Sequence, residues 1–147
     1  MTPVWLPDVE ATEALGRRLA AVVRAGDVIT LDGPLGAGKT SLARGLLAGL
    51  GLVGEAPSPS FAIVQPYEAP EVRLPVSHVD LYRLSNPREL EELGLDDLAD
   101  TLLLVEWPER AGDGAWPDAL ALSIEPAAAG RRLTARVPPA WTNRWPT

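Results

Sequence analysis

Residues 28–50 read VITLDGPLGAGKTSLARGLLAGL, which joins three kinds of sequence in one short run. The first four residues are β-branched or apolar, as is typical of a buried parallel strand. Residues 33–40 match the phosphate-binding pattern G-x-x-x-x-G-K-[ST] in full. Residues 39–50 have the composition of a helix, which Gly51 is expected to end. A strand, a glycine-rich loop and a helix in this order are the context of a true phosphate-binding loop (P-loop), so we predict a nucleotide site here.

Lys39 is the only lysine in the chain, and the other 12 of its 13 basic residues are arginine. A compact ammonium group can lie along the loop and touch two phosphates, whereas a planar guanidinium fits poorly there. The retained lysine therefore favours a working P-loop over a glycine-rich helix start. A single lysine at this position also excludes the Asn-Lys-x-Asp segment with which GTPases read guanine, so adenine is favoured.

The composition indicates a soluble globular protein of one domain, with 147 residues of which 46% are hydrophobic. Its net charge of −7 argues against free-standing binding of nucleic acid, which needs a concentrated basic surface. The absence of cysteine excludes disulfides and thiolate metal sites. No apolar run approaches the ~18 residues of a membrane span, and the first residues do not read as a signal peptide. We therefore expect a cytoplasmic protein.

Hydrophobic spacing and turn residues predict further elements on both sides of the P-loop. A helix is expected to open at Pro7-Asp8 and to be capped by Gly26, and a shorter one to run from its N-cap Asn86 through Leu93. Strands are expected at residues 4–6, 60–67, 72–80, 101–107, 119–124 and 133–137, the second and third forming a hairpin. Residues 1–137 are assigned to one P-loop domain, and residues 138–147 to an irregular tail that contains proline and tryptophan.

Two carboxylates are candidates for holding Mg²⁺ beside the P-loop, because this ion prefers carboxylates at strand ends that face the loop. Glu106 ends the apolar run LLLV, and Asp80 ends the run VSHV. Either residue could instead be an ordinary strand-end charge or a turn cap. In a working P-loop the amides of residues 35–40 wrap the β-phosphate, Lys39 pairs the β- and γ-phosphates, and the Thr40 hydroxyl ligates Mg²⁺.

Three further residues have settings that leave their roles open. Ser60 lies in a loop where P-loop hydrolases can carry a switch that senses the γ-phosphate, although an ordinary loop is the commoner interpretation. His78 is the only histidine, and a lone histidine in a strand is more often a hydrogen-bonded core residue than a catalyst. Trp107 follows Glu106, and both packing and ring contact with a nucleotide or partner fit its position.

Four segments together resemble the TsaE family, formerly called YjeE. They are residues 33–40, SPSF at 58–61, HVDLYRL at 78–84 and EWPE at 106–109, and they occur in the order and approximate spacing of that family. The P-loop alone is shared by very many proteins, whereas the HxDLYRL and EWPE segments are much more specific. The resemblance covers roughly residues 5–137.

The resemblance implies a small α/β P-loop domain with a central, mainly parallel sheet flanked by helices. It also implies an ATPase that holds Mg²⁺ with Thr40, Asp80 and Glu106, and in which Lys39, Asp80 and Glu106 act in catalysis. Ser60 stands where the family has threonine, which keeps the hydroxyl and loses the methyl group. The residues then expected to contact ATP are Gly33, Pro34, Leu35, Gly36, Ala37, Gly38, Lys39, Thr40, Ser41, Ser60 and Trp107.

The resemblance further implies a role in making threonylcarbamoyladenosine in tRNA. In that pathway TsaC makes threonylcarbamoyl-AMP, the TsaB–TsaD pair transfers the group to tRNA, and TsaE binds the pair and hydrolyses ATP to reset it. Contact with tRNA is then expected only through the partners, in keeping with the negative net charge. Activity without the partners is expected to be weak, and a monomer is plausible.

Two alternatives use the same loop. A small-molecule kinase needs an acceptor pocket and usually an arginine-bearing lid, and residues 84–102 contain only Arg88 as a basic residue. A nucleotide-binding adaptor would bind ATP and a partner without turnover.

Overall fold

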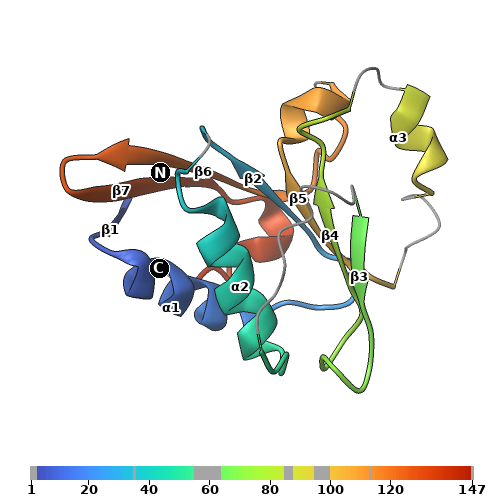
Figure 1. Ribbon diagram of the computed structural model, residues 1–147, viewed down its shortest axis with the longest axis horizontal. Helices are drawn as coiled ribbons and strands as arrows, with labels where there is room; N and C mark the ends of the chain where they lie inside the picture. The colour runs from blue at the N-terminus through green and yellow to red at the C-terminus, as the bar shows by residue number, and fades with distance from the viewer. Residues whose placement is uncertain are drawn as a thin grey trace.

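The computed structural model describes residues 3–34, 36–54, 64–84, 88–94, 100–112 and 114–146. Figure 1 shows its strands and helices around a central sheet. In the names that follow, η denotes a short 3-10 helix. In chain order they are β1 (Val4–Leu6), α1 (Val9–Ala20), β2 (Val28–Asp32), α2 (Lys39–Gly49), β3 (Val64–Tyr67), β4 (Val76–Asp80), α3 (Arg88–Glu92), β5 (Leu102–Glu106), η2 (Pro108–Ala111), β6 (Leu120–Ala127), β7 (Gly130–Arg136) and η3 (Pro139–Trp141). Within these described ranges, no helix has the length and apolar character that a membrane crossing requires.

The strands form one seven-stranded sheet in the order β1-β7-β6-β2-β5-β4-β3. The four central strands are parallel, since β2 pairs in parallel with both β6 and β5, and β5 pairs in parallel with β4. Antiparallel pairs that involve β1, β3 and β7 complete the two flanks. The predicted α/β P-loop class is confirmed, and parallel pairing occupies the centre of the sheet, where the P-loop leaves β2.

Helices α1 and α2 lie side by side on one face of the sheet (Figure 1). They approach closely because glycines, among them Gly16 and Gly45, leave no side chain in the contact. A Cβ atom on Gly16 would collide with the carbonyl oxygen of Leu42, and one on Gly45 would collide with that of Glu13. Apolar residues of both helices pack in the main core with residues of β2, β5, β6 and β7. The P-loop is thereby held between a central strand and a packed helix.

The strand β5 separates two apolar clusters. Leu102 and Leu104 belong to the main core, whereas Leu103 and Val105 pack in a second cluster on the opposite side. This alternation follows from the two-residue period of a strand. It places Glu106 on the same side as Leu102 and Leu104, which is the side that α1 and α2 cover.

The helix α1 begins as predicted but ends earlier than predicted. At its start, the Asp8 carboxylate accepts a hydrogen bond from the Ala11 amide at 2.8 Å, as an N-cap does. At its end, the helix stops at Ala20 instead of continuing to the neighbourhood of Gly26.

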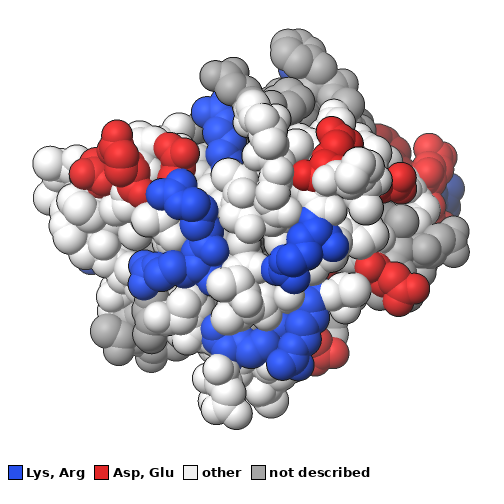
Figure 2. Space-filling model, turned by 90° about the horizontal axis from the view of Figure 1, so that it is seen from below, with Lys and Arg blue, Asp and Glu red and all other residues white. Residues whose placement is uncertain are grey.

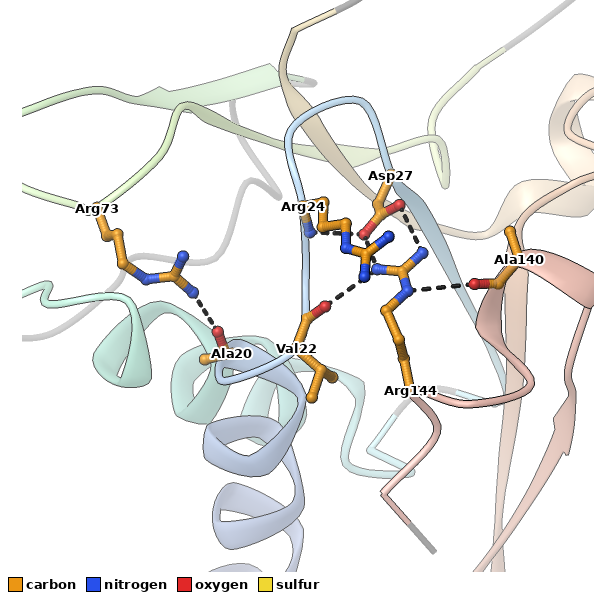
Figure 3. A network of polar contacts seen from close by, with 7 residues as sticks. All are labelled: Ala20, Val22, Arg24, Asp27, Arg73, Ala140 and Arg144. Atoms are coloured by element: carbon orange, nitrogen blue, oxygen red, sulfur yellow. Dashed lines mark hydrogen bonds and ion pairs between the residues drawn. The ribbon is translucent and has the colours of Figure 1, made fainter.

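Polar side chains explain this early end (Figure 3). Arg73, from the loop between β3 and β4, donates a hydrogen bond to the carbonyl oxygen of Ala20. The Asp27 carboxylate accepts a hydrogen bond from the Arg24 amide at 2.7 Å. In a longer helix, the Arg24 amide would donate a hydrogen bond to the Ala20 carbonyl. Both groups are bonded to side chains instead, so residues 21–27 leave the helix and lead to β2.

Strands β3 and β4 form the predicted hairpin, but β4 begins at Val76 rather than at Val72. The residues before it cross the end of α2, where the Arg73 amide donates to the Leu50 carbonyl at 2.8 Å. Residues 60–63 of the first predicted strand, and the predicted helix cap Asn86, lie outside the described residues.

The segment after β7 contains η3 and is tied to the turn between α1 and β2. Trp141 is 1% exposed and belongs to the main core. Arg144 donates to the two carboxylate oxygens of Asp27 at 2.7 and 3.1 Å and to the Val22 carbonyl at 3.0 Å (Figure 3). The guanidinium carbon also lies 4.0 Å from the centre of the Trp141 ring. The tail expected to be irregular therefore contains a helical turn and a core residue.

Charge is spread unevenly over the surface. Figure 2 shows the face seen from below in Figure 1, where basic side chains gather toward the middle and acidic ones lie nearer the margins. The net charge of −7 therefore coexists with a face on which basic groups are prominent.

Candidate functional site

The P-loop joins β2 to α2 along a close-packed path. Gly33 lies against β6, where a Cβ atom would collide with the carbonyl oxygen of Ile124. Gly38 is the N-cap of α2 with a left-handed φ of 109°, which favours glycine, and it supplies no side-chain cap. The first amides of α2 are thus left for an anion, which the helix dipole also favours. Leu35 lies outside the described residues.

Lys39 is held inside the site rather than in solvent. It is 4% exposed, and its ammonium group donates to the Gly33 carbonyl at 2.6 Å. The same nitrogen lies 3.6 Å from the centre of the Trp107 ring. Burial lowers the pKa of Lys39, while nearby carboxylates, chiefly Glu106 and Asp80, act to raise it. An ammonium shielded from water therefore lies between the loop and two acids.

Asp80 and Glu106 end neighbouring parallel strands and are partners in the β4–β5 register. Glu106 is 3% exposed, whereas Asp80 is half-buried and accepts a hydrogen bond from the Tyr82 amide at 2.9 Å. Burial raises the pKa of Asp80 and the charge of Glu106 adds to this effect, while the Tyr82 amide, His78 and Lys39 act to lower it. The structure thus brings both predicted carboxylates to the edge of the sheet beside Lys39.

His78 contacts Glu106 within the sheet. Its Nε2 atom lies 2.6 Å from Oε2 of Glu106, and the histidine is 1% exposed. Its Nδ1 atom is also buried, and no residue that the structure describes offers it a hydrogen bond. The expected hydrogen-bonded core histidine is therefore present, and its partner is one of the candidate site carboxylates.

The donor set fits Mg²⁺ chemically, since two carboxylates and the Thr40 hydroxyl offer only hard oxygen ligands. Among the residues that the structure describes, no three or more Asp, Glu and His side chains form a ready-made metal cluster. Mg²⁺ usually completes its shell with water and substrate phosphates, so a partial protein set suits a nucleotide-dependent ion. Thr40 and Ser41 lie in the first turn of α2 and are half-buried, whereas Ser60 lies outside the described residues.

Trp107 has an unusual backbone, with φ 61° and ψ 50° in the left-handed region. Its ring reaches Lys39 and lies 4.9 Å from the ring of Tyr82. It also borders a cavity of about 610 Å³ whose wall includes Gly33 and Pro34. These contacts support the packing interpretation, and contact with a nucleotide stays a prediction.

Sequence reasoning missed two features of this site. Asp32 and Glu109 both line the cavity. Burial raises the pKa of Glu109, and a hydrogen bond to Asp32 raises it further. Arg131, at the start of β7, reaches Gly36 and Gly38 of the P-loop. The EWPE segment contained a signal for Glu109. Arg131 had none, because it lies far from the loop in the sequence and belongs to no motif.

Comparison with known proteins places this site in a family. A family model described as "Threonylcarbamoyl adenosine biosynthesis protein TsaE" matches residues 6–134. The chain is 47% identical over 115 residues to the tRNA threonylcarbamoyladenosine biosynthesis protein TsaE of Streptomyces coelicolor, which covers 77% of this chain and 78% of that protein. The protein of the same name from Synechocystis sp. is 46% identical over 112 residues, covering 72% of this chain and 69% of that protein.

A solved structure agrees with the sequence matches. The crystal structure of Bacillus subtilis YdiB is similar with a TM-score of 0.75 and 31% sequence identity, covering 91% of this chain and 83% of that chain. The family match spans the P-loop and both strand-end carboxylates, and it includes most of the chain. The chain therefore belongs to the TsaE family of threonylcarbamoyl adenosine biosynthesis proteins.

Proposed function

We propose that this protein is a Mg²⁺-dependent ATPase of tRNA threonylcarbamoyladenosine biosynthesis. The observation that carries the proposal is the position of Lys39, whose ammonium is buried between the Gly33 carbonyl and the carboxylates of Asp80 and Glu106. A P-loop, its lysine and strand-end acids are the parts with which P-loop enzymes hold nucleotide phosphates and position water. Membership of the TsaE family supports the pathway.

The chain's own residues account for phosphate binding and charge stabilisation. The amides at the start of α2 and the ammonium of Lys39 would hold the β- and γ-phosphates and stabilise the charge that develops on them. Thr40, Asp80 and Glu106 would hold Mg²⁺, which neutralises phosphate charge when bound. The contact of His78 with Glu106 at 2.6 Å restricts how that carboxylate can turn. Asp80 or Glu106 would then orient the attacking water.

We further propose that the TsaB–TsaD pair is the partner that hydrolysis resets, and that tRNA is contacted only through this pair. The names of the family and of its relatives support a link to the threonylcarbamoyladenosine machinery. The net charge of −7 suits a subunit that does not itself grip tRNA. The expected location is the cytoplasm, where the modification of tRNA would take place.

Hydrolysis of Mg²⁺-ATP by the purified chain, alone and with the TsaB–TsaD pair, tests the proposal. We expect weak turnover alone, a changed rate with the pair, and a loss of about a hundredfold or more in Lys39→Ala, which removes a group that stabilises the transition state. Asp80→Ala and Glu106→Ala should each weaken Mg²⁺-dependent nucleotide affinity or turnover.

The outcomes separate the alternatives. Tight ATP binding with no turnover in any mixture would contradict an ATPase and favour the adaptor. Phosphate transfer to a metabolite would favour the kinase. Unchanged affinity and turnover in both carboxylate variants would contradict the assignment of Mg²⁺ to Asp80 and Glu106.

A further inference from the structure

Arg131 reaches the P-loop from the opposite side to the candidate carboxylates. It lies at the start of β7, which is separated from β2 by β6 in the sheet. Its stem crosses the loop so closely that a Cβ atom on Gly38 would lie 2.9 Å from both Cδ and Nε of Arg131. Its terminal nitrogen Nη2 is 3.4 Å from the carbonyl oxygen of Gly36. The guanidinium is therefore positioned beside the residues that lead into α2.

The polar atoms of this guanidinium are poorly satisfied. Its Nε is buried and has no hydrogen-bond partner among the described residues, and the contact with Gly36 is near the long limit of a hydrogen bond. In the part of the chain that the structure describes, Arg131 takes part in no ion pair, whereas its neighbour Arg132 pairs with Glu125 at 3.1 Å. A buried N–H donor without an acceptor is unfavourable, so this arrangement calls for an acceptor.

The surroundings make an anion the fitting acceptor. The N-terminus of α2 carries partial positive charge, and Lys39 places a full positive charge in the same loop. Glu106 and Asp80 lie close enough to act on the charge of Lys39, whereas the described residues give Arg131 no ion pair. A negative ligand between Arg131 and the start of α2 would therefore balance the positive charge on this side of the loop. Phosphate oxygens accept charge-assisted hydrogen bonds from guanidinium, ammonium and backbone amide groups alike.

We infer that Arg131 is a nucleotide-binding residue that donates to the phosphate nearest the nucleoside, an inference that rests on the proposed ATP site. The sheet order gives the direction of the phosphate chain. Asp80 and Glu106 end β4 and β5 on one side of β2, whereas Arg131 comes from β7 on the other side. The γ-phosphate belongs beside Lys39 and the carboxylates, so the nucleoside end extends toward Arg131.

This placement separates Arg131 from the groups that act on the transferred phosphate. ATP and ADP share the phosphate nearest the nucleoside and differ only at the γ-position. The loss of Arg131 should therefore weaken the binding of both nucleotides to a similar degree. For the same reason it should raise KM by more than it lowers kcat, because the contact is equally present before and during the reaction.

The test compares Arg131→Met with Arg132→Met, a matched variant of the next residue. Methionine keeps an unbranched stem over Gly38 and removes the guanidinium. Isothermal titration calorimetry measures the Kd of ATP and of ADP, each in the presence of Mg²⁺. In Arg131→Met, the Kd of each nucleotide should rise by about tenfold to a hundredfold, which is the range expected for the loss of a charge-assisted hydrogen bond. Arg131→Lys should be intermediate because it keeps the charge, and Arg132→Met should match the wild type.

Several results would overturn the inference. Unchanged Kd values in Arg131→Met, with normal binding by the wild type, would overturn it and leave the proposed function standing. A loss confined to ATP and to kcat would place Arg131 at the γ-phosphate instead. A lower melting temperature of nucleotide-free Arg131→Met would show a structural role, because removing a guanidinium that has no ion-pair partner among the described residues should not destabilise the empty protein. A wild-type chain that binds neither nucleotide would defeat the proposed function and this inference together.

Discussion

Asp80 is a single carboxyl group whose surroundings favour its protonated form, because burial and the charge of Glu106 both raise its pKa. The folded protein therefore holds this proton at a pH where the unfolded chain has released it. The contribution of Asp80 to stability is fully present below its ordinary pKa of 3.8 and is lost as pH rises through the raised value.

Asp80→Asn should for this reason raise the melting temperature of the nucleotide-free protein at neutral pH. Asparagine keeps an oxygen that can accept the hydrogen bond from the Tyr82 amide, so the substitution removes mainly the charge. The gain should shrink as pH falls through the raised pKa of Asp80 toward its ordinary value, because the wild-type carboxyl group then takes up a proton and becomes neutral like the amide. Melting curves across this range measure the effect, with the exposed Asp118→Asn as control. A gain of equal size at every pH would contradict this account.

At the level of single residues, the sequence predicts the groups whose position follows from a local pattern. Lys39 is fixed by the P-loop motif, and Asp80 and Glu106 follow from the rule that the carboxyl ends of parallel strands meet at one edge of a sheet. The contact between His78 and Glu106 depends on which strands pair, and the approach of Arg131 depends on a strand much later in the chain. Neither contact can be predicted from the residues adjacent in the sequence.

Among the elements, the close contact between α1 and α2 depends on glycines, which have no side chain to hold the helices apart. Gly45→Ala should destabilise the protein by about 1–3 kcal/mol, as overpacking does, even though alanine favours the helix by about 1 kcal/mol. The reason is that the new Cβ atom would collide with the backbone of Glu13, which cannot move without separating the helices. Urea denaturation measures the loss.

A matched change on the same helix is Ala48→Ser, which adds an atom at an exposed position. It should alter stability by no more than about 0.5 kcal/mol. Similar effects of the two substitutions would argue against close helix contact as the cause.

The ends of elements show where local patterns fail. The start of α1 could be predicted from the local sequence, because the side chain of Asp8 caps the helix. The end at Ala20 could not be predicted from the local sequence, because the hydrogen bond to its carbonyl oxygen comes from Arg73 in a loop far along the chain. The apolar stripe of residues 11–23 continues past the true end, since Val23 remains buried in the core without being helical.

Across the whole molecule, the last residues close the fold through Arg144. Its guanidinium and the Asp27 carboxylate are largely buried, with side-chain exposures of 10% and 14%. The sequence predicted no structure here, because a segment rich in proline without apolar periodicity gives no sign that Trp141 enters the core. The family match ends at residue 134, before this segment begins.

Arg144→Leu should lower the free energy of unfolding by about 2–4 kcal/mol, because it leaves the Asp27 carboxylate buried without its bidentate partner. Adding Asp27→Asn should recover part of this loss, since no buried charge then remains unpaired. Arg132→Ala breaks the ion pair with Glu125, whose side chains are 49% and 58% exposed, and should cost less than about 1 kcal/mol. Equal losses in Arg144→Leu and Arg132→Ala, measured by urea denaturation, would contradict the anchoring role.

Amine-directed reagents have almost nothing to react with on this protein. Acylating labels and lysine cross-linkers need an accessible amine, and the only lysine is 4% exposed inside the P-loop. A cross-linking map of any complex would have to use carboxylate-directed chemistry, for which the chain offers 20 acidic side chains, or photoreactive groups. Slow acylation of Lys39 that a bound nucleotide prevents would in turn report occupancy of the loop without any engineered probe.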